Sequence, residues 1–425
     1  MSAVPAEMTG PVRADSVPAA WAVWRRRCLA AGWTPTAGHE RVPVQRAVGR
    51  VTAGPVHARC SVPAFELAAM DGIAVRAGDL AGASPASPVR LAPDAFDVVD
   101  TGDPVPPGRD AVVMREHVTH LLDGGVELTG PTTAGRHVRG VGENVLAGEA
   151  LLPGGHRLRP VDVAVTAGAG HDTLTVRRRP RVAVLPTGDE VRPIGTAIHR
   201  CEVLDTNSPM LASMAEEAGC EPVVLPVTPD DRDAIATAVR SVADRVDLVL
   251  VIAGSSAGRD DHTAAVLAGL GEVAVHGVAM RPGHPVVLGV VDGRAPVPAV
   301  GVPGYPVAAA HVFDTFARPL IGSLEGTAPA DPATVRARLA RAVTSPVAVD
   351  ECLLVRLAPP SAGGAPVAVP IGRGAGALSA LMRADAVLRM PVGTAGLDAG
   401  SDVLVERRTG APAERPDDPD RPGPY

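Results

Sequence analysis

Hydrophobic and polar positions alternate in different ways along successive parts of the chain. Between residues 179 and 324, aliphatic runs of strand length alternate with segments of helical spacing. Leu248–Ile252 has the length and β-branched content of a buried parallel strand, and Arg181–Pro186 and Glu221–Val227 are predicted to be further strands. This alternation predicts an α/β fold with a doubly wound, mostly parallel sheet that is covered on both faces.

Helix signals lie between these strands. Asn207 or Ser208 is predicted to cap the first helix of this region, because a short polar side chain at that position can accept from free backbone N–H groups. In the N-terminal helix, Trp21, Trp24 and Leu29 more plausibly form one packing face than a binding site. The helices are predicted at about residues 18–31, 208–218, 230–244, 261–270 and 307–316.

Shorter strand-like runs before and after this region predict β domains with many turns. Val335–Val343, Glu351–Leu357, Pro366–Ile371 and Asp402–Arg407 are candidate strands of the last domain. The predicted division is a disordered N-terminus (1–16), a discontinuous linker domain (17–60 and 137–178), an inserted β domain (61–136), the α/β domain (179–324), a C-terminal β domain (325–408) and a disordered tail (409–425).

Composition narrows the class of protein. Aromatic residues make up only 2% of the 425 residues, so the cores must be built from aliphatic side chains, and the net charge of −7 argues against a nucleic-acid binder. The sequence contains no lysine, and its five cysteines (28, 60, 201, 220 and 352) show no metal-ligand spacing. No apolar run is long enough to span a membrane, and no secretory signal is evident. We therefore expect a cytoplasmic protein that associates neither with nucleic acid nor with a membrane.

Candidate anion-binding loops follow the strands of the α/β region. Gly254, Ser255, Ser256 and Gly258 form a small-residue loop between a predicted strand and a predicted helix N-terminus, an arrangement that presents backbone N–H groups to a phosphate. Small loops after strands are also common for steric reasons alone. Two turns rich in proline and glycine, at 281–285 and 303–306, end later strand-like runs, and loops at the carboxyl ends of strands converge on one crevice.

Several segments, in order over roughly residues 45–322, resemble one known family. They read AVGRV, FELAAMDGIAV, TGDPVPPGRDAVV, LPTGDEV, DTNSPML, AGSSAGRDDHT, RPGHP and VPGYP. They resemble the MoeA/gephyrin E-domain family, the molybdopterin molybdenumtransferases. The resemblance implies insertion of molybdate into adenylylated molybdopterin with release of AMP, the last step of molybdenum cofactor biosynthesis. It also implies an elongated homodimer with sites shared between subunits, and leaves open as partners the adenylyltransferase and apo-molybdoenzymes.

The resemblance also implies roles for individual residues. Mg²⁺ is implied as a cofactor that carboxylates hold, with Glu190 and Asp261 as its candidate ligands. On local grounds, Glu190 and Asp261 could equally be helix N-caps, and Asp71, which precedes a glycine, could simply begin a turn. The implied catalytic residues are Asp71, Thr101, Glu190, Asp231 and Asp261. The implied molybdopterin-binding residues are Asn207, Gly254, Ser255, Ser256, Gly258, Arg281, Pro282, Gly283, His284, Pro303, Gly304 and Tyr305.

Departures from the family pattern fall in the same loops. Ala253 stands where a glycine is usual, His284 where a lysine is usual, and Tyr305 where an asparagine is usual. A histidine can lose its charge near neutral pH, whereas a lysine keeps it. These departures leave open a non-catalytic protein that binds molybdopterin or an oxyanion, as a sensor or cofactor carrier. They also leave open a homologue that prefers tungstate, which the sequence does not distinguish from molybdate.

Overall fold

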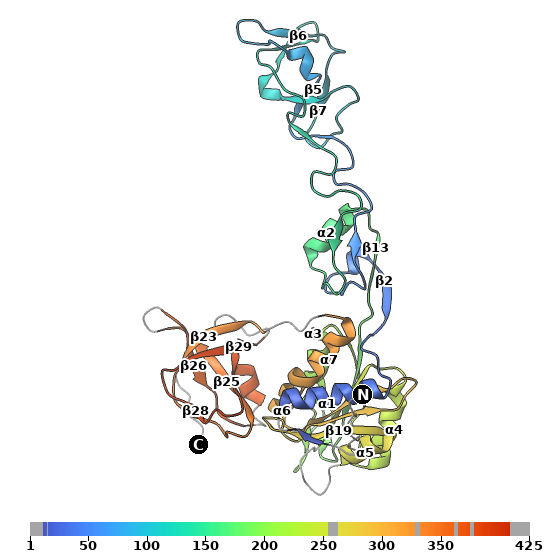
Figure 1. The fold of residues 1–425 in the computed structure, drawn as a ribbon, viewed down its shortest axis with the longest axis vertical. Helices are drawn as coiled ribbons and strands as arrows, with labels where there is room; N and C mark the ends of the chain where they lie inside the picture. The colour runs from blue at the N-terminus through green and yellow to red at the C-terminus, as the bar shows by residue number, and fades with distance from the viewer. Residues whose placement is uncertain are drawn as a thin grey trace, which may run out of the picture. The chain divides into compact units, whose positions relative to one another are not determined.

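A computed structural model describes residues 12–14, 16–253, 262–327, 332–360, 364–374 and 378–408. The chain divides into two compact units (Figure 1): one comprises Met1–Gly38 with Arg178–Tyr425, and the other comprises His39–Arg177. Most of the predicted disordered N-terminus and the whole predicted tail lie outside the described residues. In the part of the chain that is described, no helix is both long enough and apolar enough to cross a membrane.

The first unit is built on a seven-stranded sheet. Its order is β1-β19-β21-β22-β18-β14-β17, and all neighbours are parallel except those on either side of β21. The predicted mostly parallel sheet is therefore confirmed. The strands are β1 (Val12–Ala14), β14 (Arg181–Pro186), β17 (Glu221–Val224), β18 (Leu248–Ala253), β19 (Gly271–Val278), β21 (Val287–Val291) and β22 (Val297–Pro303).

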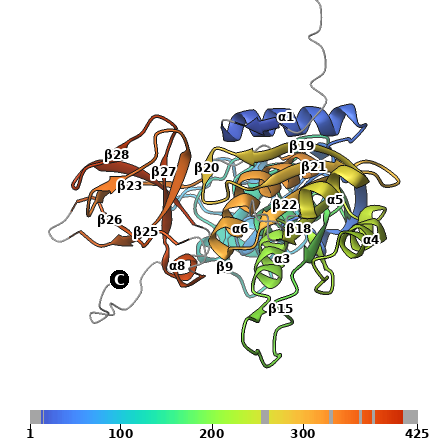
Figure 2. The ribbon, with the colours of Figure 1, turned by 90° about the horizontal axis from the view of Figure 1, so that it is seen from below.

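Helices cover both faces of this sheet, as expected. α4 (Arg232–Ala243) and α5 (His262–Leu270) lie beside each other on one face (Figure 2), where Ile235, Val239 and Leu267 are buried against the strands. The core on the other face is formed with α1, α3 and the continuous run from α6 to α7. Their bounds are α1 (Val17–Ala30), α3 (Asn207–Glu217), α6 (Pro306–Val312), a π-helical turn η4 (Phe313–Ala317) and α7 (Arg318–Glu325).

The N-terminal segment differs from its prediction in two ways. Val12–Ala14, inside the segment predicted to be disordered, forms a strand that pairs in parallel with β19. α1, which we assigned to the linker domain, packs on the α/β sheet, because Trp24 is fully buried there and Trp21 packs against the same core. Leu29 does not share that packing face, since it is 43% exposed.

A six-stranded sheet forms the C-terminal β domain of the same unit, with the order β20-β25-β26-β23-β29-β27. β29 has the predicted bounds, whereas β27 and the short helix α8 (Leu378–Arg383) were not predicted. β20 is contributed by the chain segment that precedes β21 of the α/β sheet, so it joins the two sheets. The strands are β20 (Met280–Arg281), β23 (Thr334–Leu339), β25 (Asp350–Ala358), β26 (Val367–Pro370), β27 (Ala386–Met390) and β29 (Asp402–Arg407), with β24 (Val343–Thr344) and β28 (Gly396–Leu397) paired separately.

The second unit consists of short strands and a few helical turns, as the sequence predicted. One core lies between β2, β13 and α2, and separate cores lie among the strands of residues 67–139. The division into the two predicted β domains stays a prediction. The elements are β2 (His39–Pro43), η1 (Val44–Arg46), β3 (Val56–His57), β4 (Leu67–Ala68), β5 (Gly72–Val75), η2 (Ala77–Leu80), β6 (Val89–Leu91), β7 (Asp97–Val99), β8 (Ala111–Met114), η3 (Arg115–His117), β9 (Thr119–His120), β10 (Val126–Leu128), β11 (Val138–Arg139), β12 (Ala150–Leu152), α2 (Pro160–Gly168) and β13 (Thr173–Arg177).

A buried carboxylate holds the start of α2. Asp162 is 5% exposed; it accepts from the backbone N–H of Arg159 at 2.8 Å, from the Arg159 guanidinium at 2.8 Å, and lies 2.7 Å from Nε2 of His156. These contacts, with the Arg159 side chain contributing most, hold the pKa of Asp162 well below its usual range. The carboxylate therefore stabilises the unit at neutral pH.

Replacing Asp162 with asparagine should lower the free energy of local opening of α2 by about 1–3 kcal/mol at neutral pH. This is the cost of leaving buried hydrogen-bond partners unsatisfied. Because the folded-state pKa lies below the unfolded one, the contribution is present above about pH 4 and is lost as the pH falls towards the folded-state pKa. Hydrogen exchange of α2 in the full chain, measured at pH 7 and at about pH 2.5, roughly 1.4 units below the usual aspartate value, tests this. An equal difference between wild type and variant at the two pH values would contradict it.

Candidate active site

A cavity of about 1110 Å³ lies at the carboxyl ends of the central strands of the α/β sheet. Its walls come from the loops that follow β14 and β22, from the turn after β20, and from β25 and the segment before α8 in the C-terminal β domain. Loops at the carboxyl ends of parallel strands were expected to converge in this way. The predicted residues that line it are Glu190, Asn207, Arg281, Pro282, Gly283, His284, Pro303, Gly304 and Tyr305.

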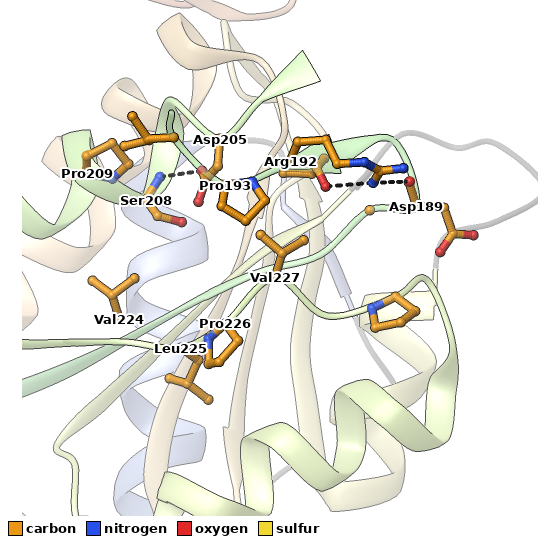
Figure 3. Close-up of a pocket in the computed structure, with 14 residues that line it drawn as sticks. Asp189, Arg192, Pro193, Asp205, Ser208, Pro209, Val224, Leu225, Pro226 and Val227 are labelled. Carbon is orange, nitrogen blue, oxygen red and sulfur yellow. Dashed lines mark hydrogen bonds between the residues drawn. The ribbon is translucent and has the colours of Figure 1, made fainter. Parts of the chain in front are cut away.

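Asn207 joins two of these loops rather than capping a helix. Thr206 is the N-cap position of α3, and the predicted cap at Asn207 or Ser208 is wrong because the Asp205 carboxylate accepts from the Ser208 backbone N–H at 2.9 Å (Figure 3). The Asn207 amide instead donates to the Gly304 carbonyl at 2.7 Å. Its Oδ1 is buried and has no hydrogen-bond partner among the described residues. A ligand N–H group would satisfy this acceptor.

Gly283 is required by the packing of its turn. Its φ is +103°, and an added Cβ would lie 2.6 Å from Cε of Met280 and 2.9 Å from Cγ2 of Val312. A side chain at this position would therefore be strained in its backbone and would also collide with the helix behind the turn. Glycine allows the turn to approach α6 closely, which places Arg281 and His284 on the wall of the cavity.

Two polar contacts orient the ring of His284. Its Nδ1 lies 2.7 Å from the Val278 carbonyl oxygen, which only accepts, so Nδ1 carries the proton. Its Nε2 lies 3.4 Å from a terminal nitrogen of Arg13, which only donates, so Nε2 is the acceptor. In this arrangement the guanidinium of Arg13 in β1 is the permanent cation beside the ring.

Replacing His284 with glutamine should change the dissociation constant for molybdate by less than about 3-fold, because an amide can donate to Val278 and accept from Arg13. If the ring were instead a cation that binds the anion, the same change would weaken binding by about 10-fold or more. Calorimetric titration of molybdate into the two proteins distinguishes these outcomes. His284→Lys provides the comparison with a permanent charge.

Three carboxylates, those of Asp189, Glu190 and Asp230, lie near one another in the segments after β14 and before α4. The Asp230 backbone N–H donates to Asp189 at 3.3 Å, and Glu190 lines the cavity. Burial raises the pKa of Asp230, and the charges of Glu190 and Asp189 raise it further, while a hydrogen bond from Thr187 acts in the opposite direction. Because two carboxylate charges add to the effect of burial on this pKa, a cation would be stabilised at this position.

Asp230, rather than the predicted Asp231, lies close to Glu190 and Asp189. The Asp231 carboxylate accepts from the Ala234 backbone N–H at 2.9 Å and so caps α4, while its catalytic role stays a prediction. The signal was present in the sequence, because an aspartate directly before a helix is most often its N-cap. Glu190 does not cap a helix, since it lies between β14 and β15 (Val191–Arg192).

A cation site remains a proposal. Among the described residues, no three histidine, cysteine, aspartate or glutamate side chains are arranged to hold a metal ion. The second predicted ligand, Asp261, lies outside the described residues, as do Gly254, Ser255, Ser256 and Gly258 of the predicted phosphate loop. Carboxylate oxygens are the ligands that Mg²⁺ prefers, so Glu190 and Asp230 fit such an ion chemically.

Asp71 and Thr101 lie together in the second unit. The backbone N–H and the hydroxyl of Thr101 both donate to one oxygen of Asp71, at 2.8 and 2.7 Å. These hydrogen bonds, the hydroxyl first, lower the pKa of Asp71, and Arg115 contributes less. Both residues are exposed, but the hydroxyl proton of Thr101 is used by Asp71. Thr101 would therefore have to release Asp71 before its hydroxyl could donate to an oxyanion.

A smaller cavity of about 650 Å³ lies on the other side of the β15–β16 segment, where β16 is Val203–Leu204 (Figure 3). Its lining is mostly apolar, with Pro193, Pro209 and Pro226 among the contributing side chains. None of the residues predicted for catalysis or binding lines it. We therefore place the candidate active site in the larger cavity.

The sequence matches three family models in order along the chain. They are described as "MoeA N-terminal region (domain I and II)" over residues 16–170, "Probable molybdopterin binding domain" over 183–323, and "MoeA C-terminal region (domain IV)" over 336–407. The larger cavity lies between the parts of the chain covered by the second and third matches.

Known proteins similar to this chain carry related names. A Haemophilus influenzae protein named "Molybdopterin molybdenumtransferase" is 32% identical over 68% of this chain and 73% of its own length. A Mycobacterium tuberculosis protein named "Molybdopterin molybdenumtransferase 2" is 36% identical over 65% of this chain and 73% of its own length.

A solved structure is similar over almost the whole chain. The molybdopterin biosynthesis MoeA protein of Pyrococcus horikosii is 30% identical, covers 93% of this chain and 99% of its own, and superposes with a TM-score of 0.80. Together with the ordered sequence matches, this similarity places the chain in the MoeA family of molybdopterin molybdenumtransferases.

Proposed function

We propose that this chain is an enzyme that inserts molybdate into adenylylated molybdopterin and releases AMP. The observation that carries the proposal is the convergence of the RPGHP turn, the VPGYP turn and Asn207 on one large cavity beside a carboxylate group. A ligand with a pterin and phosphate groups needs such a combination of backbone turns, amide acceptors and cations. The names of the relatives support the same reaction.

Each part of the cavity has a role in this proposal. Glu190 and Asp230 would hold Mg²⁺, which when bound neutralises charge on the leaving phosphate. Arg281 faces the cavity as a cation for an anionic group of the ligand. Asn207 offers its buried Oδ1 to a ligand N–H group and fixes the VPGYP turn through Gly304. Tyr305, 65% exposed on the cavity wall, offers a flat face to a heteroaromatic ring.

A molybdate-dependent release of AMP tests the proposal. The protein is incubated with adenylylated molybdopterin and Mg²⁺, with molybdate, with tungstate, or with neither, and AMP is quantified by chromatography. We expect AMP release that requires the oxyanion; comparing initial rates decides which oxyanion is preferred. Tight binding of the adenylylated substrate without AMP release in any condition would favour the carrier or sensor function instead.

We propose that the protein works as a homodimer, in which Asp71 and Thr101 of one subunit face the cavity of the other. The support for this arrangement is that the two residues lie in a different compact unit from the cavity. Both are exposed to solvent, and the Thr101 hydroxyl donates to the Asp71 carboxylate. A cytoplasmic location, the adenylyltransferase as the source of the substrate and apo-molybdoenzymes as recipients belong to the same proposal.

The homodimer predicts a mass of about twice the 43.2 kDa of one chain at micromolar concentration, as measured by light scattering. It also predicts that mixing inactive Asp71→Asn protein with inactive Glu190→Gln protein restores AMP release, because a mixed dimer contains one intact shared site. A monomeric mass with full activity, or two inactive variants that never complement each other, would contradict the shared site.

A further inference from the structure

A buried glutamate lies on the wall of a cavity proposed to take anionic ligands. Glu351 is 2% exposed, and its Oε1 lies 3.2 Å from Nε of Arg373 and 3.8 Å from Nε of Arg281. Its Oε2 accepts from the Nη2 atom of Arg373 at 3.3 Å. All three residues line the larger cavity. One carboxylate oxygen is thus shared by two guanidinium groups.

The two arginines come from different domains and are brought together by the backbone. Arg281 belongs to β20, and it pairs directly with Glu351 of β25 in a parallel register. The Asp350 backbone N–H donates to the Ala279 carbonyl at 2.9 Å, next to this pair. Because residues opposed across neighbouring strands carry their side chains on the same face, this register fixes Arg281 beside Glu351.

Arg373 is anchored from the C-terminal β domain. Its Nη2 also donates to the Thr344 carbonyl, so this nitrogen is shared between two acceptors of that domain. Its side chain is 35% exposed and that of Arg281 is 55% exposed, while that of Glu351 is only 3% exposed. The glutamate therefore lies behind the two guanidinium groups, which remain accessible from the cavity.

The charges of this group leave a surplus of one positive charge. Because both guanidinium groups lie within 3.8 Å of the same carboxylate oxygen, they would repel each other if Glu351 were not charged. Among the described residues, the two terminal nitrogens of Arg281 have no hydrogen-bond partner, so its planar fork remains available for a phosphate or oxyanion. An anion arriving from the cavity would meet guanidinium groups that are already ordered.

We propose that Glu351 is a positioning residue, which holds Arg281 and Arg373 together as a clamp for one tetrahedral anionic group of the ligand. The identity of that ligand rests on the function proposed above; the clamp itself rests only on the geometry of Glu351 and its two arginines. It deepens the site by giving the C-terminal β domain a part in anion recognition. If Glu351 only repelled the anion, removing its charge would strengthen anion binding, whereas loss of the clamp would weaken it.

The sign of one substitution separates these possibilities. Glu351→Gln keeps the size of the side chain but removes its charge, and it should weaken molybdate binding about 10-fold, the equivalent of one hydrogen bond to a charged group. In an Arg373→Ala background, Glu351→Gln should weaken molybdate binding less than about 2-fold, because the effects of substitutions at coupled residues are not additive. Molybdate affinity is measured by calorimetric titration of the full chain.

Controls and contradicting outcomes are available in the same domain. Glu406→Gln removes a carboxylate that pairs with Arg389 at 2.7 Å and does not line the cavity, and it should leave molybdate affinity unchanged. Unchanged or tighter binding by Glu351→Gln, or independent effects in the double variant, would overturn the clamp. If Glu351→Gln does not fold, Arg373→Ala alone decides, since wild-type molybdate affinity in that variant also overturns it.

The experiment also separates this inference from the proposed function. Molybdate binding that depends on Glu351, in a protein that never releases AMP, would leave the clamp standing and remove the transferase. AMP release with the same Michaelis constant for molybdate in wild type and in Glu351→Gln would leave the transferase and remove the clamp.

Discussion

Replacing Glu190 with glutamine should lower the rate of AMP release about 100-fold, the usual scale for losing a group that stabilises charge in a transition state. Asp230→Asn should have a comparable effect, because Asp230 lies close enough to Glu190, which lines the cavity, for the charge of Glu190 to raise its pKa. Initial rates at saturating adenylylated molybdopterin, with Mg²⁺ and molybdate present, provide the measurement.

The neighbouring residue provides a matched control. Asp231→Asn removes one negative charge at the next position, but asparagine caps a helix as well as aspartate does, so folding and rate should both stay near wild type. A loss of activity in Asp231→Asn with full activity in Asp230→Asn would restore the assignment made from the sequence. Wild-type rates in both Glu190→Gln and Asp230→Asn would remove the acidic group from the mechanism.

Replacing Trp24 with alanine should lower the free energy of unfolding by about 3–5 kcal/mol, the range for removing a large buried aromatic side chain. Trp24 is fully buried between α1 and the α/β sheet, contacts Trp21 and Phe316 edge to face, and donates from Nε1 to the Gly289 carbonyl at 2.7 Å. Its removal leaves both a cavity and an unsatisfied buried carbonyl. Urea denaturation followed by circular dichroism measures the change.

Trp24→Phe separates the two contributions. The phenyl ring fills most of the space but cannot donate to Gly289, so this variant should lose about 1–3 kcal/mol, the cost of one unsatisfied buried group. Leu29→Ala, at an exposed position of the same helix, should change stability by no more than about 0.5 kcal/mol. A Trp24→Ala protein as stable as the Leu29→Ala protein would show that α1 does not anchor to the sheet as described.

Features that depend only on neighbouring residues and on strand direction could be predicted from the sequence. The aliphatic runs of β14 and β18 were predicted within a residue or less, because a buried parallel strand is a continuous apolar run. The convergence of the RPGHP and VPGYP turns followed from the rule that the carboxyl ends of parallel strands share one edge of the sheet. The sequence alone therefore locates these parts of the candidate site.

The remaining features depend on contacts between distant segments. The pairing of β20 with β25, which brings Arg281 to Glu351, joins residues about 70 positions apart, and a two-residue strand has no periodicity of its own. β1 forms only because β19 offers an open edge, so its three residues read as disordered in isolation. The contribution of Arg373 and Glu351 to the cavity was missed for the same reason.

The proposed function requires that the cavity turns over its ligand rather than storing it. The most direct measurement counts AMP released per chain when adenylylated molybdopterin is supplied in large excess, with Mg²⁺ and molybdate present and with product removed as it forms. We expect many AMP molecules per chain with molybdate, almost none without an oxyanion, and almost none from Glu190→Gln. AMP that stops at one molecule per chain or fewer, with substrate still bound, would contradict the account and identify the protein as a carrier or sensor.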